Sequence, residues 1–394
     1  MSNKKIFLCL AHMGGNEMKY IQEAFDTNWV APLGPNVNAF ETDLERFAGN
    51  GKKVVALASG TAAVHLGMIA LGVDKGDEVI CQSFTFAASC NPAMYLGATP
   101  VFVGSEEKTW NMDPQKLEEA IKDRILKTGK KPKVIVPVYM YGMPAYIDEI
   151  MEIANRYEIP VLEDSAEAFG SLYKGQMTGT FGQFGIMSFN GNKMITTSGG
   201  GALICPDEET KRKIMFYATQ ARENKPYYLH KEIGYNYRLS NVCAGIGRGQ
   251  MEVVYDHIRH HRHIADLYTQ AFNDMDEIQM HREPEEYMEP NYWLSTITFE
   301  GKDSKCATTG AGCEPCEQVM RTMKALAAEG IESRPLWKPM HTQPVYKDAP
   351  AYVDGTSERL FTKGLCLPSG PMVTDEDVER IIRIIKESLY TKQH

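Results

Sequence analysis

The chain has 394 residues, which at roughly 100–200 residues per domain is enough for two or three domains. Its 43% hydrophobic and 24% charged residues exclude a disordered chain or a fibre, and the formal charge of −9 argues against nucleic-acid binding. No apolar run approaches the roughly 18–20 residues that span a bilayer, so we expect a cytoplasmic protein without a membrane partner.

Apolar runs bounded by Gly or Pro alternate with amphipathic patterns from about residue 54 to about residue 205. The predicted strands are residues 54–58, 134–138 and 160–162. Three helices are predicted. The first covers residues 61–71, the second begins at Asp113-Pro114, and the third carries the apolar stripe Ile147, Ile150, Met151 and Ala154. This alternation predicts βαβ units and therefore an α/β protein with a mostly parallel sheet covered by helices.

The pattern changes beyond about residue 250, where a long polar helix is followed by a less regular segment and a closing helix. Thr374 and Asp377 form a capping-box-like pair at the start of that closing helix. We therefore predict a large domain over residues 1–250, with an N-terminal arm, and a smaller C-terminal domain over residues 251–394.

Two clusters could suggest a metal site, but we predict ordinary structure for both. Cys313 and Cys316 have only Cys306 nearby and lack the second pair of a structural zinc site, and the odd total of nine cysteines indicates reduced thiols. Four histidines share a predicted helix without the H-E-x-x-H pattern: His257, His260, His261 and His263. We expect no bound metal.

Ser59-Gly60-Thr61 lies where a predicted strand turns into a helix. Backbone N–H groups and hydroxyls at such a turn face the positive end of the helix dipole and can hold a small anion, although the same residues also form an ordinary turn and helix cap. The Walker pattern is absent, and Gly245-x-Gly247-x-Gly249 follows no convincing strand. Nucleoside triphosphate and dinucleotide sites are therefore disfavoured.

Asp164 follows the strand at 160–162, at the strand end where open α/β sheets bind ligands. A carboxylate there can hold a cationic ring nitrogen, or it can simply cap a helix. Lys193 comes later, in a turn before the triple glycine that ends at Gly201. A lysine displayed in such a turn can form a Schiff base if its surroundings lower its pKa.

These three segments together supply what one cofactor needs. The Gly60 turn can hold a monophosphate, Asp164 can pair with a pyridinium nitrogen, and Lys193 can condense with an aldehyde. The sequence therefore predicts pyridoxal 5′-phosphate as the cofactor.

Four further motifs are Glu163-Asp-Ser-Ala-Glu-Ala168, Ser188-Phe-Asn-Gly-Asn-Lys193, Gln220-Ala-Arg-Glu223 and Gly234-Tyr-Asn-Tyr-Arg-Leu-Ser240. On these motifs the sequence resembles the DegT/DnrJ/EryC1/StrS family of sugar aminotransferases. The resemblance extends from His12-Met-Gly-Gly15 to Leu367-Pro-Ser-Gly370. It implies a fold-type-I PLP-dependent transferase with a large domain and a smaller C-terminal α+β domain. Within the family, the sequence most resembles transaminases that make UDP-4-amino-4,6-dideoxy-N-acetylglucosamine in the bacillosamine pathway.

The resemblance also implies roles for individual residues. Lys193 would bind the cofactor aldehyde and shuttle protons, Asp164 would pair with the ring nitrogen, and Phe86 would stack on the ring. Further cofactor-binding residues are Gly60, Thr61, Ser188, Glu167 and, from the neighbouring subunit of a homodimer, Asn236. The expected sugar-nucleotide contacts are Arg238, Arg334, Trp337, Lys338 and His341. Where many family members have Gln, this chain has Glu167, which can donate a hydrogen bond only when protonated.

The implied reaction takes an amino group from L-glutamate, releases 2-oxoglutarate and aminates a UDP-linked 4-keto-6-deoxy-N-acetylhexosamine. Another nucleotide-linked keto sugar, either a GDP-4-keto or a dTDP-3-keto compound, is the alternative within the class. A PLP-dependent sugar dehydratase is disfavoured because that subgroup carries His at the position of Lys193. A catalytically idle PLP-binding regulator is the alternative from another class.

Overall fold

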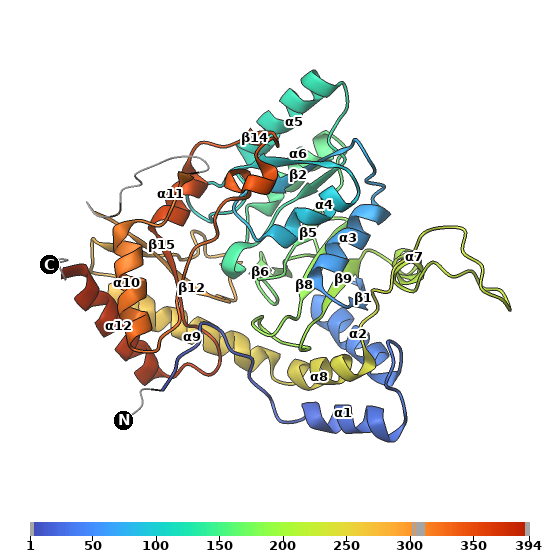
Figure 1. The fold of residues 1–394 in the computed structure, drawn as a ribbon, viewed down its shortest axis with the longest axis horizontal. Helices are drawn as coiled ribbons and strands as arrows, with labels where there is room; N and C mark the ends of the chain where they lie inside the picture. The colour runs from blue at the N-terminus through green and yellow to red at the C-terminus, as the bar shows by residue number, and fades with distance from the viewer. Residues whose placement is uncertain (1–3, 302–303, 305–311, 391–394) are drawn as a thin grey trace.

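A sheet of eight strands runs through the larger part of the computed structural model, which describes residues 4–301, 304 and 312–390 (Figure 1). It combines two groups, in the orders β14-β3-β2-β4 and β5-β8-β9-β1. The strands are β1 (Lys53–Leu57), β2 (Glu78–Gln82), β3 (Thr99–Val103), β4 (Val134–Val136), β5 (Leu162–Asp164), β8 (Phe184–Ser188), β9 (Gly201–Cys205) and β14 (Ala351–Tyr352).

The two groups of strands meet where β4 lies beside β5. Parallel bridges join Ile135 to Val161 and Val138 to Asp164, and the Asp164 backbone N–H donates to the Pro137 carbonyl at 2.9 Å. Asp164 therefore lies at the carboxyl end of a central strand, where open parallel sheets bind their ligands.

The sheet is parallel except at β9, which runs antiparallel to both β8 and β1. Residues 189–200, which join β8 to β9, contain no helix. A parallel return needs a longer crossover that is usually helical, so the chain turns back as a hairpin instead. The loop of this hairpin carries Lys193.

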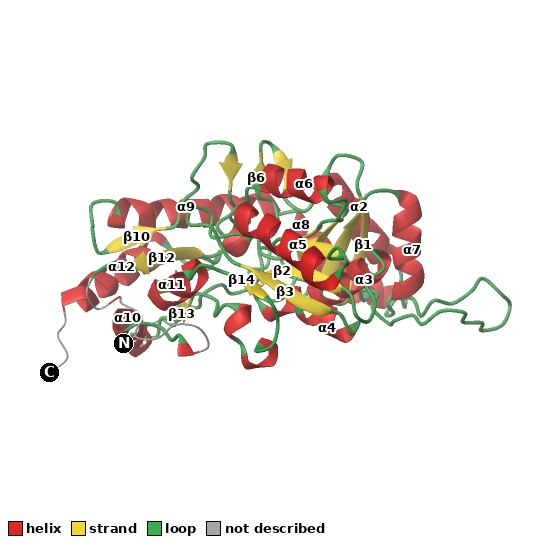
Figure 2. Cartoon of the chain, turned by 90° about the horizontal axis from the view of Figure 1, so that it is seen from above, coloured by secondary structure: helices red, strands yellow, loops and turns green. Residues whose placement is uncertain are grey.

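Helices cover both faces of the sheet (Figure 2). Alternate side chains of each strand point to opposite faces. Val55 and Leu57 of β1 point to the face that a first group of helices covers, whereas Val54 and Ala56 point to the face that a second group covers. The first group is α3 (Gly60–Ala70), α4 (Asn91–Tyr95) and α7 (Glu208–Ala218). The second is α2 (Pro35–Ala48), α5 (Pro114–Thr128), α6 (Ile147–Arg156) and α8 (Asn241–Met251). The predicted strand and helix around Ser59 are thus confirmed as β1 and α3, and Asp113 caps α5 as expected.

The glycines of α8 have a packing role. Helix α1 (Glu17–Asp26) lies against α8, and a Cβ at Gly249 would come within 2.7 Å of the Glu17 backbone nitrogen. A Cβ at Gly247 would likewise come within 2.7 Å of the Phe40 ring in α2. These glycines therefore allow close helix packing and do not form a loop after a strand.

A second, antiparallel sheet has the order β10-β12-β15-β13. Its strands are β10 (Ile278–Met280), β12 (Ser295–Phe299), β13 (Arg334–Pro335) and β15 (Gly364–Leu367). The helices beside it are α9 (Val254–Phe272), α10 (Glu317–Ala328), α11 (Thr356–Lys363) and α12 (Asp375–Tyr390). A small third sheet joins β6 (Leu172–Tyr173) to β7 (Gln176–Met177) and β11 (Met288–Glu289). The predicted capping box is confirmed, because Thr374 and Asp377 exchange backbone-to-side-chain hydrogen bonds at 3.2 Å.

Two segments cross between the large sheet and the second sheet. Near the N-terminus, Ile6 pairs with Ile331, and the Ser369 backbone N–H donates to the Leu8 carbonyl. In the opposite direction, β14 returns from the C-terminal part to pair with β3. The division at residue 250 remains a prediction, and these crossings tie the two predicted domains together. None of the helices in the described ranges has the length and apolar character that crossing a bilayer requires.

Candidate active site

A cavity of about 250 Å³ lies at the carboxyl ends of β5 and β8, beside the start of α3. Three segments singled out in the sequence contribute to its wall. They are represented by Ser59, Gly60 and Thr61, by Asp164 and Glu167, and by Ser188 and Lys193. The strand order brings these segments together even though more than one hundred positions separate the first from the last.

The start of α3 forms one end of this cavity. The Ser59 hydroxyl accepts a hydrogen bond from the Ala62 N–H at 3.0 Å and so caps the helix. The other N–H groups of a first turn have no partner within the helix and are available to an anion. A Cβ at Gly201 would lie 2.4 Å from the Gly60 nitrogen, so glycine is needed for β9 to pass this close. The arrangement fits a phosphate group.

Asp164 lies deeper in the cavity and is 4% exposed. The Ser89 hydroxyl donates to its Oδ2 at 2.6 Å, and the Ala166 N–H donates to its Oδ1 at 3.0 Å. Burial raises the pKa of this carboxyl, while the Ser89 and Ala166 hydrogen bonds and the Lys193 charge act in the opposite direction. A cationic ring N–H placed against Asp164 would compensate the buried negative charge.

Lys193 extends from the β8–β9 hairpin into the same cavity. Its Nζ lies 3.5 Å from Glu167 Oε1 and 3.8 Å from the centroid of the Trp293 ring. The Trp293 indole N–H donates to the Asn192 carbonyl at 2.6 Å, which fixes the ring beneath the amine. An amine held this way is positioned to condense with an aldehyde. Sequence reasoning missed Trp293, because it lies one hundred positions from Lys193 and belongs to no recognisable pattern.

Phe86 and Trp337 form an aromatic edge of the cavity. Their ring centroids are 5.4 Å apart, and the rings are tilted by 54°. Phe86 is 54% exposed, so a ligand ring is able to cover it. This position agrees with the predicted stacking role.

A second cavity, of about 490 Å³, adjoins the first. The two share Asn192, Trp293 and Trp337, and the second also includes Cys9 and Arg334. The Arg334 guanidinium is mostly exposed and pairs with Glu332 at 2.7 Å. This cavity offers space for a substrate next to Lys193, with one cation on its wall.

Other predicted contact residues lie outside both cavities. The Arg238 guanidinium is buried, is paired with Glu41 and points toward β1. The Lys338 ammonium pairs with Glu314 at 3.0 Å. His341 hydrogen-bonds Ser83 and Glu358. The structure therefore gives Arg238 a structural partner and does not bring it to the predicted sugar site.

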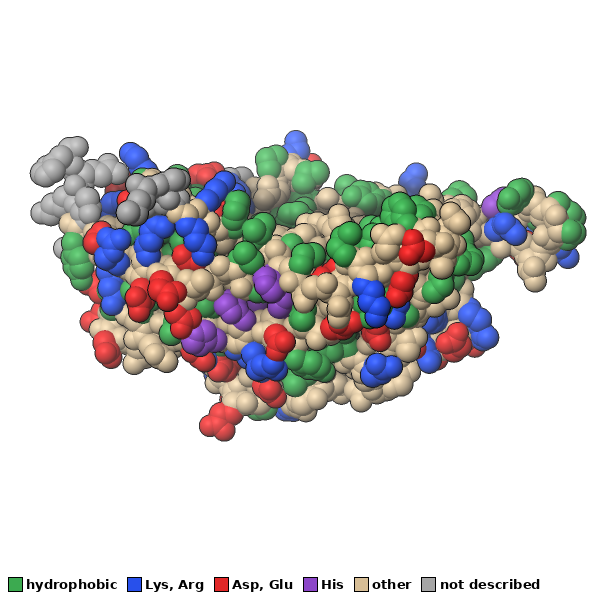
Figure 3. Space-filling view, turned by 90° about the horizontal axis from the view of Figure 1, so that it is seen from below, with side chains coloured by type: hydrophobic (Ala, Val, Ile, Leu, Met, Phe, Trp, Pro, Cys, Tyr) green, Lys and Arg blue, Asp and Glu red, His purple; other side chains and the backbone are tan. Residues whose placement is uncertain are grey.

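Asn236 also lies away from the cavity of its own chain. It is exposed and pairs with Thr219 at the base of the segment that projects between α7 and α8 (Figure 1). This projecting segment carries hydrophobic side chains beside Lys, Arg and His side chains (Figure 3). Tyr228 and Ile233 on it are 79% and 82% exposed, respectively.

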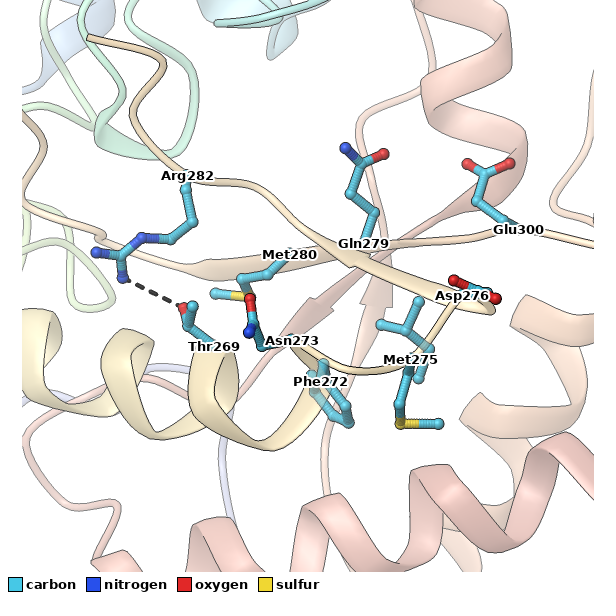
Figure 4. Close-up of a pocket in the computed structure, with 10 residues that line it drawn as sticks. Thr269, Phe272, Asn273, Met275, Asp276, Gln279, Met280, Arg282 and Glu300 are labelled. Atoms are coloured by element: carbon cyan, nitrogen blue, oxygen red, sulfur yellow. Dashed lines mark hydrogen bonds between the residues drawn. The ribbon is translucent and has the colours of Figure 1, made fainter.

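A separate hollow of about 340 Å³ lies where α9 meets β10 (Figure 4). Arg282 donates to Thr269 at 3.3 Å at its edge. It shares no lining residue with the cavity of Lys193 and has no lysine on its wall. The amine chemistry therefore belongs to the first cavity.

The histidine and cysteine clusters show ordinary contacts. His257 hydrogen-bonds the Met194 carbonyl, His261 hydrogen-bonds the Tyr292 carbonyl, and His263 pairs with Asp375. Cys306 lies outside the described residues, and Cys313 and Cys316 are both buried. Within the described ranges, no group of three or more His, Cys, Asp or Glu side chains is arranged to hold a metal ion.

The residues present fit pyridoxal phosphate. The cavity combines an anion site, a buried carboxylate opposite a possible ring nitrogen, an amine and an aromatic edge. Glycine at position 201 lets β9 approach the start of α3, because a Cβ there would lie 2.4 Å from the Gly60 nitrogen.

Comparison with known proteins agrees with this geometry. The model of the DegT/DnrJ/EryC1/StrS aminotransferase family matches residues 11–386. The chain is 45% identical over 393 residues to EpsN of Bacillus subtilis (strain 168), a protein named for pyridoxal phosphate-dependent aminotransferase activity; the match covers 99% of this chain and 97% of EpsN. It is 35% identical to GDP-perosamine synthase of Escherichia coli O157:H7, with 95% of each chain covered.

A third relative is the UDP-N-acetyl-3-dehydro-alpha-D-glucosamine 3-aminotransferase of Acidithiobacillus ferrooxidans, which is 31% identical, with 91% of this chain and 90% of the relative covered. Among solved structures, Spr1654 from Streptococcus pneumoniae, titled a sugar aminotransferase in its PLP form, superposes with a TM-score of 0.87. It shares 25% sequence identity, and 98% of each chain is covered. The fold is therefore that of the fold-type-I PLP-dependent transferases, and the cofactor is pyridoxal phosphate.

Proposed function

Since the chain belongs to the DegT/DnrJ/EryC1/StrS aminotransferase family and is a PLP-dependent sugar aminotransferase, we propose that it aminates a UDP-linked 4-keto-6-deoxy-N-acetylhexosamine. The products would be UDP-4-amino-4,6-dideoxy-N-acetylglucosamine and, with L-glutamate as the amino donor, 2-oxoglutarate. This reaction would serve bacillosamine synthesis in the cytoplasm. The observation that supports it most is the meeting of Lys193, Asp164 and the start of α3 around one cavity.

Five residues of the cavity have a task in this proposal. Bound pyridoxal phosphate supplies an aldehyde and an electron-withdrawing ring. Gly60, Thr61 and Ser188 bind the phosphate, and Asp164 keeps the ring nitrogen protonated. Lys193 Nζ accepts a proton from the α-carbon of glutamate in one half of the reaction and delivers a proton to C4 of the sugar in the other.

The adjoining cavity supports a site for the sugar nucleotide. Arg334 offers a cation for the diphosphate, and Trp337 offers a ring at the wall shared with the cofactor cavity. Lys338 and His341 lie farther along the same segment and are engaged with acidic side chains, so they contribute only if those ion pairs open. Arg238 has no part in the proposed sugar site.

A homodimer would complete the site. The exposed position of Asn236 and the apolar side chains on the neighbouring projecting segment favour contact with a second copy, in which Asn236 reaches the partner's phosphate site. Sedimentation of the wild type and of a Tyr228→Ser/Ile233→Ser variant tests this. We expect a dimer that is weakened in the variant; a wild-type monomer with full activity would contradict it.

The substrate test uses mass spectrometry of the product formed from glutamate and UDP-4-keto-6-deoxy-N-acetylglucosamine, with Lys193→Ala as the control. We expect the amino sugar only when the lysine is present. Equal product from both proteins would remove Lys193 from the mechanism.

The main alternative is a different nucleotide-linked sugar, and the 35% identity to a GDP-perosamine synthase favours a GDP-4-keto sugar among these. A panel that also contains GDP-4-keto and dTDP-3-keto sugars separates the candidates. Turnover only with one of the latter would overturn the UDP assignment. The idle-regulator alternative is not retained, because the matching family model is that of aminotransferases and the 45% identical relative EpsN is named as one.

A further inference from the structure

Two acidic side chains and one basic side chain line the cavity of Lys193. They are Asp164, Glu167 and Lys193. Asp164 has a place opposite the ring nitrogen, but the proposed reaction gives no task to the charge of Glu167. Glu167 is only 5% exposed, and its Oε1 lies 3.5 Å from Lys193 Nζ.

Two contacts position Glu167, one at its carboxylate and one at its backbone carbonyl. The Tyr141 backbone N–H donates to Oε2 at 2.8 Å, and Tyr141 has a left-handed backbone with φ of 54° in a tight turn. The Asn291 side-chain amide donates to the Glu167 backbone carbonyl at 3.0 Å. With one oxygen held by Tyr141, the other oxygen stays directed at Lys193.

Few other charges act on this pair. Among the described residues, the titratable groups that face Glu167 or Lys193 are Asp164, Tyr141, Cys366 and Cys9. Burial raises the pKa of Tyr141 and of Cys366 well above the ordinary values and that of Cys9 to about 12, so these three groups stay neutral near neutral pH. Asp164 is engaged with Ser89 and Ala166. Glu167 is therefore the carboxylate in direct contact with the lysine.

We propose that the Glu167 carboxylate holds a proton on the Lys193 nitrogen and thereby sets the pH at which the lysine–cofactor linkage becomes deprotonated. Glu167 acts here as a positioning residue through Lys193. The inference rests on the proposed role of Lys193 and goes beyond it by assigning its protonation to one neighbour.

The physical argument concerns two opposing effects on the nitrogen. Burial disfavours a positive charge on this nitrogen, whereas the opposite charge of Glu167 at 3.5 Å stabilises one. Burial also raises the pKa of Glu167, with the Lys193 charge acting against this shift. Protonation of the linkage makes the cofactor carbon that is bonded to its nitrogen more electrophilic, so the incoming amine of the amino donor attacks it more readily.

The test is a pH titration of the visible absorbance of the holoenzyme, compared between wild type and Glu167→Gln. Gln has almost the same size, and its carbonyl can still accept the Tyr141 N–H, so the change removes the charge and preserves the contact. We expect the midpoint of the deprotonation to fall by about 1–3 pH units. An unchanged midpoint would overturn the proposal.

Two further variants serve as controls. Glu167→Asp keeps the charge and should give a midpoint closer to wild type than Glu167→Gln. Glu300→Gln removes a carboxylate that pairs with Lys363 on the surface and should leave the midpoint unchanged. If both variants at position 167 moved the midpoint equally, loss of packing rather than charge would be responsible, and the proposal would fail.

A second readout needs no sugar turnover. In the cofactor-free protein, the pH dependence of Lys193 modification by an amine reagent, followed by peptide mass spectrometry, should shift in the same direction in Glu167→Gln. A shift in a protein that fails to aminate any UDP-sugar would leave this inference standing while removing the substrate assignment. Normal UDP-sugar turnover without a shift would refute this inference and leave the substrate assignment standing.

Discussion

The ion pair between Arg238 and Glu41 gives a sharp test of whether Arg238 supports the fold or the substrate. The side chains of Arg238 and Glu41 are only 7% and 5% exposed. Glu41 also accepts the Ala56 N–H at 2.8 Å and lies 3.4 Å from the Lys211 ammonium. Arg238→Met keeps the aliphatic part of the side chain and removes the charge.

Removing one partner of a buried ion pair typically costs about 3–5 kcal/mol, because the other charge is left uncompensated. Lys211 still faces Glu41, so we expect a loss at the low end, about 3 kcal/mol. The KM for the nucleotide sugar should stay within about twofold of wild type, since Arg238 lines neither cavity.

Denaturant unfolding of both proteins at one protein concentration measures the stability loss, and initial rates measure KM. A double-mutant cycle with Glu41→Gln should show coupling of about 1 kcal/mol or more, as neighbours in one network do. If Arg238→Met left the stability within about 1 kcal/mol of wild type and raised KM about tenfold, the sequence-based assignment of Arg238 to the substrate would be right and the structural argument wrong.

Three other outcomes follow from the same geometry. Asp164→Asn should retain cofactor but lower kcat by about 10- to 1000-fold, because a carboxylate partner shifts the ring-nitrogen pKa by about 1–3 units; full activity would refute the role of its charge. Gly201→Ala places a Cβ 2.4 Å from the Gly60 nitrogen, so the cofactor Kd from equilibrium dialysis should rise about tenfold or more; an unchanged Kd would contradict the phosphate site. Burial lowers the pKa of His261 and His281 from 6.5 to about 3, so the unfolded chain binds more protons between these values. The stability that the two neutral histidines contribute is complete above pH 6.5. The free energy of unfolding should fall by about 1.4 kcal/mol per pH unit for each histidine as the pH decreases through this window, and denaturant unfolding at pH 7 and 5.5 measures this loss. If the pH dependence of the unfolding free energy were unchanged in His281→Gln, that residue would have no part in the explanation.

The cofactor site could be predicted because its residues follow strand ends within short motifs. Asp164 comes directly at the end of β5, and Lys193 lies in the first connection after β8. The local sequence indicates both positions. An apolar run that ends in a polar residue, or that is followed by a glycine-rich turn, marks the edge of the sheet.

The remaining features depend on contacts between distant parts of the chain. Arg238 meets Glu41 across 197 positions, and no local pattern reveals such a partner. Trp293 reaches Lys193 in the same way. The antiparallel direction of β9 was also missed, because the hairpin from β8 is visible in the sequence only as a loop between two apolar runs.

The pairing of the N-terminal segment with the second sheet affects how the protein can be made. The Leu8 backbone N–H donates to the carboxylate of Glu332, which lies 324 positions later in the chain. Cys9 from the same segment lines the cavity that adjoins the cofactor cavity. During translation, these first residues leave the ribosome long before their partners exist. The wall of the proposed substrate cavity is therefore among the last parts to form, and a chain that terminates early would lack it even if the cofactor-binding sheet had already folded.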